Sequence, residues 1–204
     1  MGTDSRGVTM NDIEFKKYQK LNEFAEVGGI VIFGGTEDRM IPTAELKQAF
    51  EIEEKVYNRS VKDLSVLDAC SAYKTCVEEL APETVLLHIG EADEALFKAD
   101  ASSFDCAYEE LISYIKSKNS KCRIGIISLC NVKNDVTISE MNKHLKTIAD
   151  SHCCDYMDIA SKHVWNPKSF KESVSFMYSM GFVRPLKCQR PIYDLMKLFF
   201  VSLA

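Results

Sequence analysis

The sequence predicts an α/β fold, a three-layer α/β/α sandwich with a mainly five-stranded parallel sheet. Short apolar runs that suit buried strands alternate along the chain with longer segments of helical periodicity. No internal repeat, low-complexity segment or Pro/Gly-rich linker interrupts this alternation. The length of 204 residues and the 46% of hydrophobic residues also suit one domain with a sizeable core. Strands and helices that alternate in one domain indicate a parallel sheet covered by helices.

The N-terminal segment is expected to be helical and to precede the sheet. Apolar residues recur at helical spacing between residues 12 and 26, and a glycine pair then ends the pattern. We therefore divide the chain into an N-terminal tail and helix, residues 1–28, and a single α/β domain, residues 29–204. The apolar, β-branched run from Ile30 to Phe33 is typical of a strand buried on both faces.

The other elements follow in order. Further strands are expected at residues 54–57, 85–89, 123–129 and 156–159. Further helices are expected at residues 43–54, 64–80, 104–118, 139–151 and 191–204. Residues 170–179 fit no single pattern. Because ligands bind beyond the carboxyl ends of parallel strands, the loops after Phe33, Tyr57 and Ile89 are expected to hold the functional site.

Charge and composition exclude several function classes. The formal charge is -5 and the lysines and arginines are scattered, so neither a nucleic acid nor a membrane is an expected partner. The first twelve residues contain no apolar leader, and we expect a cytoplasmic protein. None of the eight cysteines is paired at CxxC spacing, so reduced thiols are expected and a structural zinc is not.

No cofactor is expected either. Gly34 and Gly35 are not followed by Lys-Ser or Lys-Thr at the spacing of a phosphate-binding loop.

The loops after the strands resemble those of the SGNH (GDSL) hydrolases, a flavodoxin-like group of esterases and lipases. That family's first block is a strand ending in Gly-Asp-Ser, which is similar to Phe-Gly-Gly-Thr at residues 33–36. Its second block, often Tyr-Asn-Arg-Gly-x-x-Gly, resembles Tyr-Asn-Arg-Ser-Val-Lys-Asp at residues 57–63. The most specific match is Gly-Glu-Ala-Asp at residues 90–93, which resembles Gly-x-Asn-Asp. The resemblance runs from residue 30 to the C-terminus and implies the SGNH hydrolase fold.

The resemblance also implies that the catalytic blocks are degenerate. It places Thr36 where the family has its nucleophilic serine, Asp63 at a glycine, and Ala92 at an asparagine that donates to the oxyanion. The family's final block, Asp-x-x-His, falls near Val183 and Arg184, and neither the Asp nor the His is present there. An ester hydrolase needs a nucleophile, a base and oxyanion donors, and here all three are altered.

These loops supply the candidate site residues. Thr36 is the candidate for a weakened nucleophile, with a hydroxyl but a stiff, branched side chain. The residues expected to line a remodelled pocket are Gly35, Glu37, Asp38, Asn58, Asp63, Gly90, Ala92, Asp93, Val183 and Arg184. Their carboxylates, with that of Glu91, are either solvated loop charges or ligands for a cationic or polar molecule or a divalent ion. No metal site is predicted.

Each of the four histidines is a possible replacement base. His88 lies within an apolar strand, where a hydrogen-bonded core residue is expected rather than a base. His144 is expected on a helix surface. His152 and His163 flank two cysteines and Asp158, but a metal site there is not favoured, because Asp158 belongs to a strand and the histidines to its flanks.

Three functions remain open from the sequence. The first is a catalytically degenerate SGNH-like protein whose pocket binds a small ligand or partner. The second is a divergent acyl-ester hydrolase that uses Thr36, with His88 or His163 as base. The third is an interaction role in which the apolar tail from Leu195 to Ala204 contacts another subunit, although that tail is expected to pack into its own domain. The substrate and the oligomeric state are not predicted.

Overall fold

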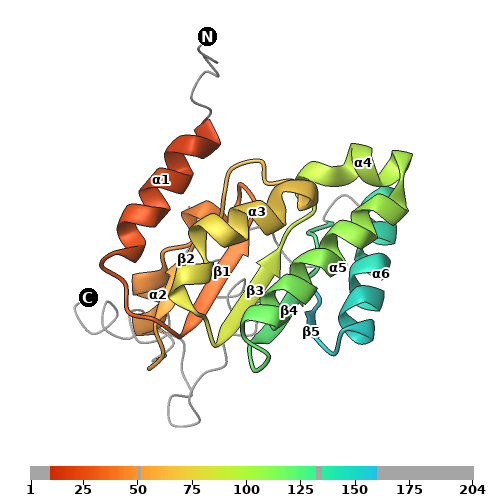
Figure 1. Ribbon diagram of the computed structural model, residues 1–204. Coiled ribbons are helices and arrows are strands. Elements are labelled where there is room, and N and C mark those ends of the chain that lie inside the picture. The colour runs from red at the N-terminus through yellow and green to blue at the C-terminus, as the bar shows by residue number, and fades with distance from the viewer. Residues whose placement is uncertain (1–9, 50–51, 132–134, 160–204) are drawn as a thin grey trace, which may run out of the picture.

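The computed structural model describes residues 10–49, 52–131 and 135–159, which form one five-stranded sheet with helices on both faces (Figure 1). Every strand pair is parallel, and the order across the sheet is β2-β1-β3-β4-β5. In chain order the strands are β1 (Ile30–Gly34), β2 (Val56–Asn58), β3 (Thr84–His88), β4 (Arg123–Ile127) and β5 (Asp155–Met157). This confirms the predicted sandwich and its flavodoxin-like order, whose switch point lies between β1 and β3.

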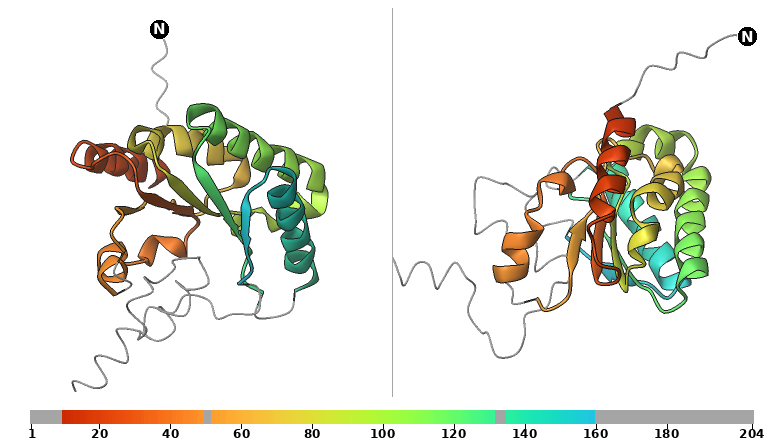
Figure 2. Two further views of the ribbon diagram at one scale, coloured as in Figure 1. Left: turned by 90° about the horizontal axis from the view of Figure 1, so that it is seen from below. Right: turned by 60° about the vertical axis from the view of Figure 1, so that its left-hand side comes forward.

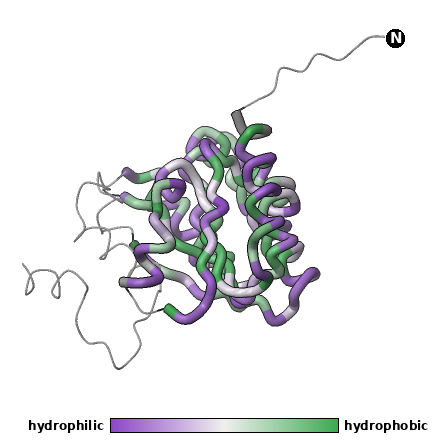
Figure 3. Tube along the Cα trace, turned by 90° about the vertical axis from the view of Figure 1, so that its left-hand side faces the viewer, coloured by the Kyte–Doolittle hydropathy of each residue, from purple (hydrophilic) through white to green (hydrophobic). Residues whose placement is uncertain are grey.

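The helices lie on the two faces of this sheet. They are α1 (Met10–Asn22), α2 (Thr43–Ala49), α3 (Val66–Cys76), α4 (Glu94–Ala99), α5 (Ala101–Lys118) and α6 (Val136–Ser151). Single 3-10 turns follow three strands or helices, namely η1 (Asp38–Met40), η2 (Glu78–Leu80) and η3 (Glu91–Asp93). Figure 2 shows α1, α3 and α5 on one face of the sheet and α2 on the other. In Figure 3 hydrophobic stretches of the trace run through the middle of the molecule.

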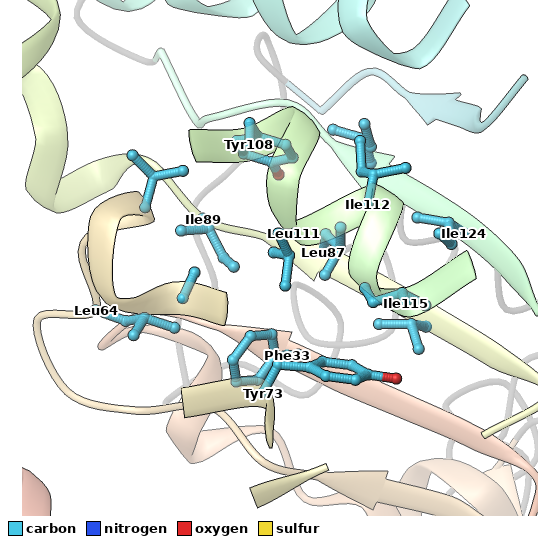
Figure 4. Close-up of a cluster of buried hydrophobic side chains, with 14 of the residues drawn as sticks. Phe33, Leu64, Tyr73, Leu87, Ile89, Tyr108, Leu111, Ile112, Ile115 and Ile124 are labelled. Carbon is cyan, nitrogen blue, oxygen red and sulfur yellow. The ribbon is translucent and has the colours of Figure 1, made fainter. Parts of the chain in front are cut away.

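The main core lies between the sheet and the helices α3 and α5, which cover one of its faces (Figure 4). Phe33 and Leu87 point into it from β1 and β3, and the Tyr73 ring of α3 meets Phe33 edge to face with centroids 5.8 Å apart. The alternate strand residues Ile32 and Leu86 are buried on the opposite face. Burial on both faces explains why these strands are continuous apolar runs without alternation.

Several helices begin at side-chain caps rather than at the first apolar residue. The Asp100 carboxylate accepts hydrogen bonds from the amides of Ser102 and Ser103 at 3.1 and 3.2 Å, so α5 begins three residues before the predicted start. Asp135 caps α6 in the same way, and that helix also starts three residues early. These carboxylates satisfy amides that have no partner within the helix.

Other boundaries also differ from the predictions. The helix expected over residues 64–80 is α3 followed by the separate turn η2, and the chain then leaves through Ala81, whose φ is 42°. Pro82 disfavours a helical residue before it, which accounts for the end of the turn. The helical segments η3 and α4, residues 91–99, were not predicted. The strand expected at residues 54–57 is formed by Val56–Asn58.

Some predictions concern residues beyond the described ranges. They are His163, the segment 170–179, Val183, Arg184 and the closing helix at residues 191–204. Across the described ranges, no helix is both long enough and apolar enough to span a bilayer.

Candidate functional site

The candidate site lies where the chain leaves β1, β2 and β3, beside the switch point of the sheet. β1 and β3 are in register so that Gly34 lies beside His88. The Gly35 amide then donates to the His88 carbonyl at 3.2 Å, which carries the pairing one residue past β1. The Val61 amide donates to the Gly34 carbonyl at 3.0 Å. The loop after β2 is therefore held against the end of β1.

Thr36 and Asp63 are joined by two hydrogen bonds at the exposed rim of these loops. The Thr36 hydroxyl donates to Asp63 Oδ1 at 2.9 Å, and the Asp63 amide donates to Thr36 Oγ1, also at 2.9 Å. Asp63 has a φ of 49°, a left-handed conformation that residues other than glycine rarely adopt. A glycine would adopt this conformation without steric cost. The hydroxyl predicted as a nucleophile therefore lies against a carboxylate.

Beneath this rim lies a buried acid–histidine pair that the sequence did not predict. Asp38 and His88 are 0% and 2% exposed, and His88 Nδ1 lies 3.0 Å from both carboxylate oxygens of Asp38. The Gly35 amide donates to Asp38 Oδ2 at 3.1 Å, and the Asn58 side chain donates to the Asp38 carbonyl at 2.6 Å. Asp38 and Asn58, expected as pocket lining, therefore build the inner wall of the site.

Gly34 makes room for this pair. A Cβ at Gly34 would lie 2.0 Å from Asp38 Oδ2 and 2.8 Å from the His88 carbonyl oxygen. Both distances are far below van der Waals contact, so only glycine fits here without displacing the carboxylate. The glycine that ends β1 is thus a requirement of the buried pair.

The electrostatics of the site favour a charged His88. Burial alone lowers its pKa, but the Asp38 charge and contact, with smaller contributions from Glu91 and Glu37, raise the pKa to about 9. Desolvation raises the pKa of Glu91 to about 7, even though this residue is partly open to solvent. Desolvation and the nearby Asp38 charge also raise the pKa of Glu37. At neutral pH a buried ion pair therefore lies below carboxyl groups that hold their protons unusually well.

The loop after β3 has two exposed residues that face the site and a buried aspartate that does not. Glu91 and Ala92 are exposed, and Glu91 Oε2 would lie only 3.3 Å from a Cβ placed on Gly35, so these residues face each other across the rim. Ala92 has no side-chain donor. Gly90 turns the chain with a φ of 131°, in the range that favours glycine.

Asp93 does not line the site as expected. Its carboxylate is buried, and it accepts hydrogen bonds from the Ser65 hydroxyl at 2.5 Å and the Val66 amide at 2.9 Å. It therefore fixes the first turn of α3. This role depends on a contact between two distant loops, and no local sequence signal reveals it.

Three residues of α1 hold the loop after β2 from outside the sheet, and the sequence analysis missed all of them. Glu14 accepts from the Lys62 amide at 3.0 Å and also pairs with the Arg39 guanidinium. The Tyr18 hydroxyl donates to the Ser60 carbonyl at 2.6 Å. Asn22 Oδ1 accepts from Arg59 Nε at 2.9 Å.

Among the described histidines, His88 lies in the site, whereas His144 and His152 contact residues outside it. His88 is a buried hydrogen-bonded residue, as predicted, and His144 lies on α6 with its Nδ1 2.9 Å from Asp105. His152 Nε2 lies 3.5 Å from Glu109. In the part of the chain that the structure describes, no three His, Cys, Asp or Glu residues are grouped to hold a metal ion.

Comparison with known proteins identifies the fold. No family model and no curated protein matches the sequence. Solved structures do match. A Streptococcus pneumonia protein assigned as a platelet activating factor has a TM-score of 0.69 at 14% identity over 84% of this chain and 91% of its own. A Parabacteroides merdae protein assigned as a GDSL-like lipase has a TM-score of 0.59 at 12% identity over 77% of this chain and 97% of its own.

The lipase/acylhydrolase from Enterococcus faecalis has a TM-score of 0.55 at 18% identity over 66% of this chain and 76% of its own. The protein therefore has the fold of the SGNH (GDSL) hydrolases, as the resemblance of its loops implied.

Proposed function

We propose that this SGNH-fold protein binds a small polar or cationic molecule at the ends of β1, β2 and β3 and does not hydrolyse esters efficiently. The reciprocal hydrogen bonds between Thr36 and Asp63 carry this proposal. The Asp63 amide is occupied by Thr36 Oγ1, so it is not free to stabilise an oxyanion. The Asp63 carboxylate adds a negative charge at the point where acyl transfer would develop one.

The loop after β3 points to the same conclusion. Ala92 occupies the exposed position at which the resemblance implies a donating asparagine, and its methyl group donates nothing. The loss of one oxyanion donor costs about 2–4 kcal/mol of transition-state stabilisation. Losses within one catalytic unit are not additive, but each one disfavours turnover.

The ligand class follows from the charges at the rim. Glu37, Asp63 and Glu91 are exposed around Thr36. Lys62 Nζ approaches Asp63 Oδ2 at 3.7 Å, and the nearby Arg39 is paired with Glu14. Carboxyl groups thus outnumber the cations, and because the pKa values of Glu37 and Glu91 are raised, these groups can both accept and donate hydrogen bonds, which favours a ligand with an amino group or several hydroxyl groups over an anion.

A second candidate is a divergent acyl-ester hydrolase, and the same contact favours it. A carboxylate 2.9 Å from the Thr36 hydroxyl is within reach of its proton. Asp63 would take that proton as Oγ1 bonds to the acyl carbon, and the departing alkoxide would then take it from Asp63. Water would hydrolyse the acyl-threonine. The Enterococcus faecalis neighbour is a lipase/acylhydrolase, so this chemistry occurs on the scaffold.

Turnover of 4-nitrophenyl acetate separates the two candidates. The wild type should be compared with Thr36→Ala, Asp63→Asn and the control Thr147→Ala, whose side chain lies on the exposed face of α6. We expect no turnover above background in any of them. Turnover that is lost in Thr36→Ala and Asp63→Asn but kept in Thr147→Ala would establish the hydrolase instead.

Ligand binding needs its own measurement. A thermal-shift screen of small amines, amino sugars and polyols should find compounds that raise the Tm of the wild type. The shift should be smaller in Glu91→Gln and unchanged in Thr147→Ala. A screen without hits, or hits that do not depend on Glu91, would contradict the ligand site.

A further inference from the structure

Helix α1 turns three hydrogen-bonding side chains inward. Glu14, Tyr18 and Asn22, spaced four residues apart, are buried and hydrogen-bond to the loop after β2 and to α3. Surface helices usually bury an apolar stripe and expose a polar one. The residues on the outside of α1 therefore need a separate explanation.

The outer surface of α1 and of the turn that follows it is apolar at both ends and basic in between. Ile13, Leu21 and Phe24 are 61%, 45% and 87% exposed. Together with the lysines between them they line a shallow hollow of about 490 Å³, formed by Ile13, Lys16, Lys17, Lys20, Leu21 and Phe24. We call this set the α1 outer face. Large apolar side chains exposed as one group, rather than singly, mark interaction surfaces.

We propose that the α1 outer face is a docking site for an acidic amphipathic helix of a partner protein. The argument rests on charge complementarity. Three lysines within five positions repel a basic partner and attract an acidic one, while Phe24 and Ile13 need apolar contacts. A partner helix that lies along the α1 outer face supplies both the acidic groups and the apolar contacts, with apolar residues at its ends and carboxylates between them.

The dimensions suit a short helix. Ile13 and Leu21 are eight positions apart in α1, which corresponds to about 12 Å along the helix at 1.5 Å per residue, and Phe24 lies in the turn just beyond it. A partner helix of about three turns spans that length. A lipid surface is the weaker alternative, because the whole chain carries a charge of -5.

Docking here would also reach the candidate site. The inner side of the same helix holds Lys62 through Glu14 and Ser60 through Tyr18, and both residues belong to the loop that ends at Asp63. A partner that clamps α1 would therefore stabilise the loop whose last residue binds Thr36. The docking proposal itself does not depend on what the site binds.

The test uses a labelled helical peptide of about 15 residues with leucines at both ends of one face and glutamates between them, a length that covers the face. Its binding to the full chain is measured by fluorescence anisotropy. A second peptide carries lysines in place of the glutamates. We expect the acidic peptide to bind and the basic one not to bind.

Variants locate the binding. Combined Lys16→Glu, Lys17→Glu and Lys20→Glu should weaken the acidic peptide by at least about tenfold, and Phe24→Asp should do the same. A matched control, combined Lys98→Glu, Lys121→Glu and Lys146→Glu, makes the same charge change at other exposed lysines and should weaken it less than about twofold. Unchanged Tm values exclude unfolding as the cause.

Other outcomes would overturn the proposal. Equal weakening by both lysine triples would mean unspecific charge attraction. Binding to phosphatidylcholine vesicles that contain phosphatidylserine, lost in Phe24→Asp while the peptide does not bind, would mean a lipid surface. Concentration-dependent self-association that Phe24→Asp abolishes would mean that a second copy covers the face.

Discussion

The substitution Asp38→Asn tests the buried ion pair most directly. It keeps the shape of the side chain and removes the charge that holds His88 protonated. In the folded protein the pKa of His88 is about 9, against 6.5 for an unperturbed histidine. Because the folded-state pKa is raised, its stabilising contribution is complete below pH 6.5 and is lost as the pH rises through 9.

The magnitude follows from these two values. Each pH unit between them changes the free energy of unfolding by about 1.4 kcal/mol, so the pair contributes about 3 kcal/mol at pH 6 and little above pH 9. The loss of one partner of a buried ion pair typically costs about 3–5 kcal/mol, which is consistent. We expect Asp38→Asn to be about 3 kcal/mol less stable than the wild type at pH 6 and close to it above pH 9.

Urea unfolding followed by far-ultraviolet circular dichroism at pH 6, 7.5 and 9 measures this difference. Asp150→Asn is the matched control, because its carboxylate lies on the exposed side of α6 and pairs with the exposed Lys146. The free energy of unfolding of this control should be less than about 1 kcal/mol below that of the wild type. If the difference between Asp38→Asn and the wild type is the same at pH 6 and pH 9, His88 is not charged by Asp38 and the account of the site is wrong.

Three further substitutions test other contacts. Gly34→Ala should lower the free energy of unfolding in urea by about 3 kcal/mol, because its Cβ would lie 2.0 Å from the Asp38 carboxylate. Gly35→Ala is the control and should lower it far less, because its Cβ would meet the end of the flexible Glu91 side chain. Asp93→Ala removes two hydrogen bonds and should cost about 2–4 kcal/mol, with faster amide exchange in the first turn of α3; unchanged exchange there would contradict the role. Asp100→Ala removes the cap of α5 and should cost about 1 kcal/mol, read as a lower Tm; an unchanged Tm would mean that the cap is dispensable.

The central strands could be predicted from sequence because each is buried on both faces. An uninterrupted apolar run such as Ile30 to Phe33 has no solvated side, and a glycine marks where it ends. The edge strands β2 and β5 have only three residues each and are half-buried or exposed. Their pattern is too short to fix a boundary, which explains why both predictions were displaced by one or two residues.

Helix starts were predicted less well because the apolar pattern begins inside the helix. For α5 and α6 the true start is set by Asp100 and Asp135, whose carboxylates accept from the amides of the first turn. An aspartate just before a periodic segment is a signal that could have been used. The segment 91–99 contains only six residues of α-helix and one turn, so no periodicity could develop.

The exposed rim of the site could be predicted from sequence better than the buried pair beneath it. Thr36 and Asp63 were both chosen from the loops after strands, and the structure brings them into contact. The pairing of Asp38 with His88 depends on the register of β1 with β3 and on the missing Cβ of Gly34. These are long-range geometric facts, and a local pattern contains neither of them.

The two faces of the sheet separate the main core from the buried ion pair. The main core, which includes Phe33 and Ile115, lies on the face that carries α3 and α5, whereas Asp38 and His88 belong to the opposite face. A substitution at the ion pair therefore changes the wall of the site without changing the packing of α3 and α5 on the other face.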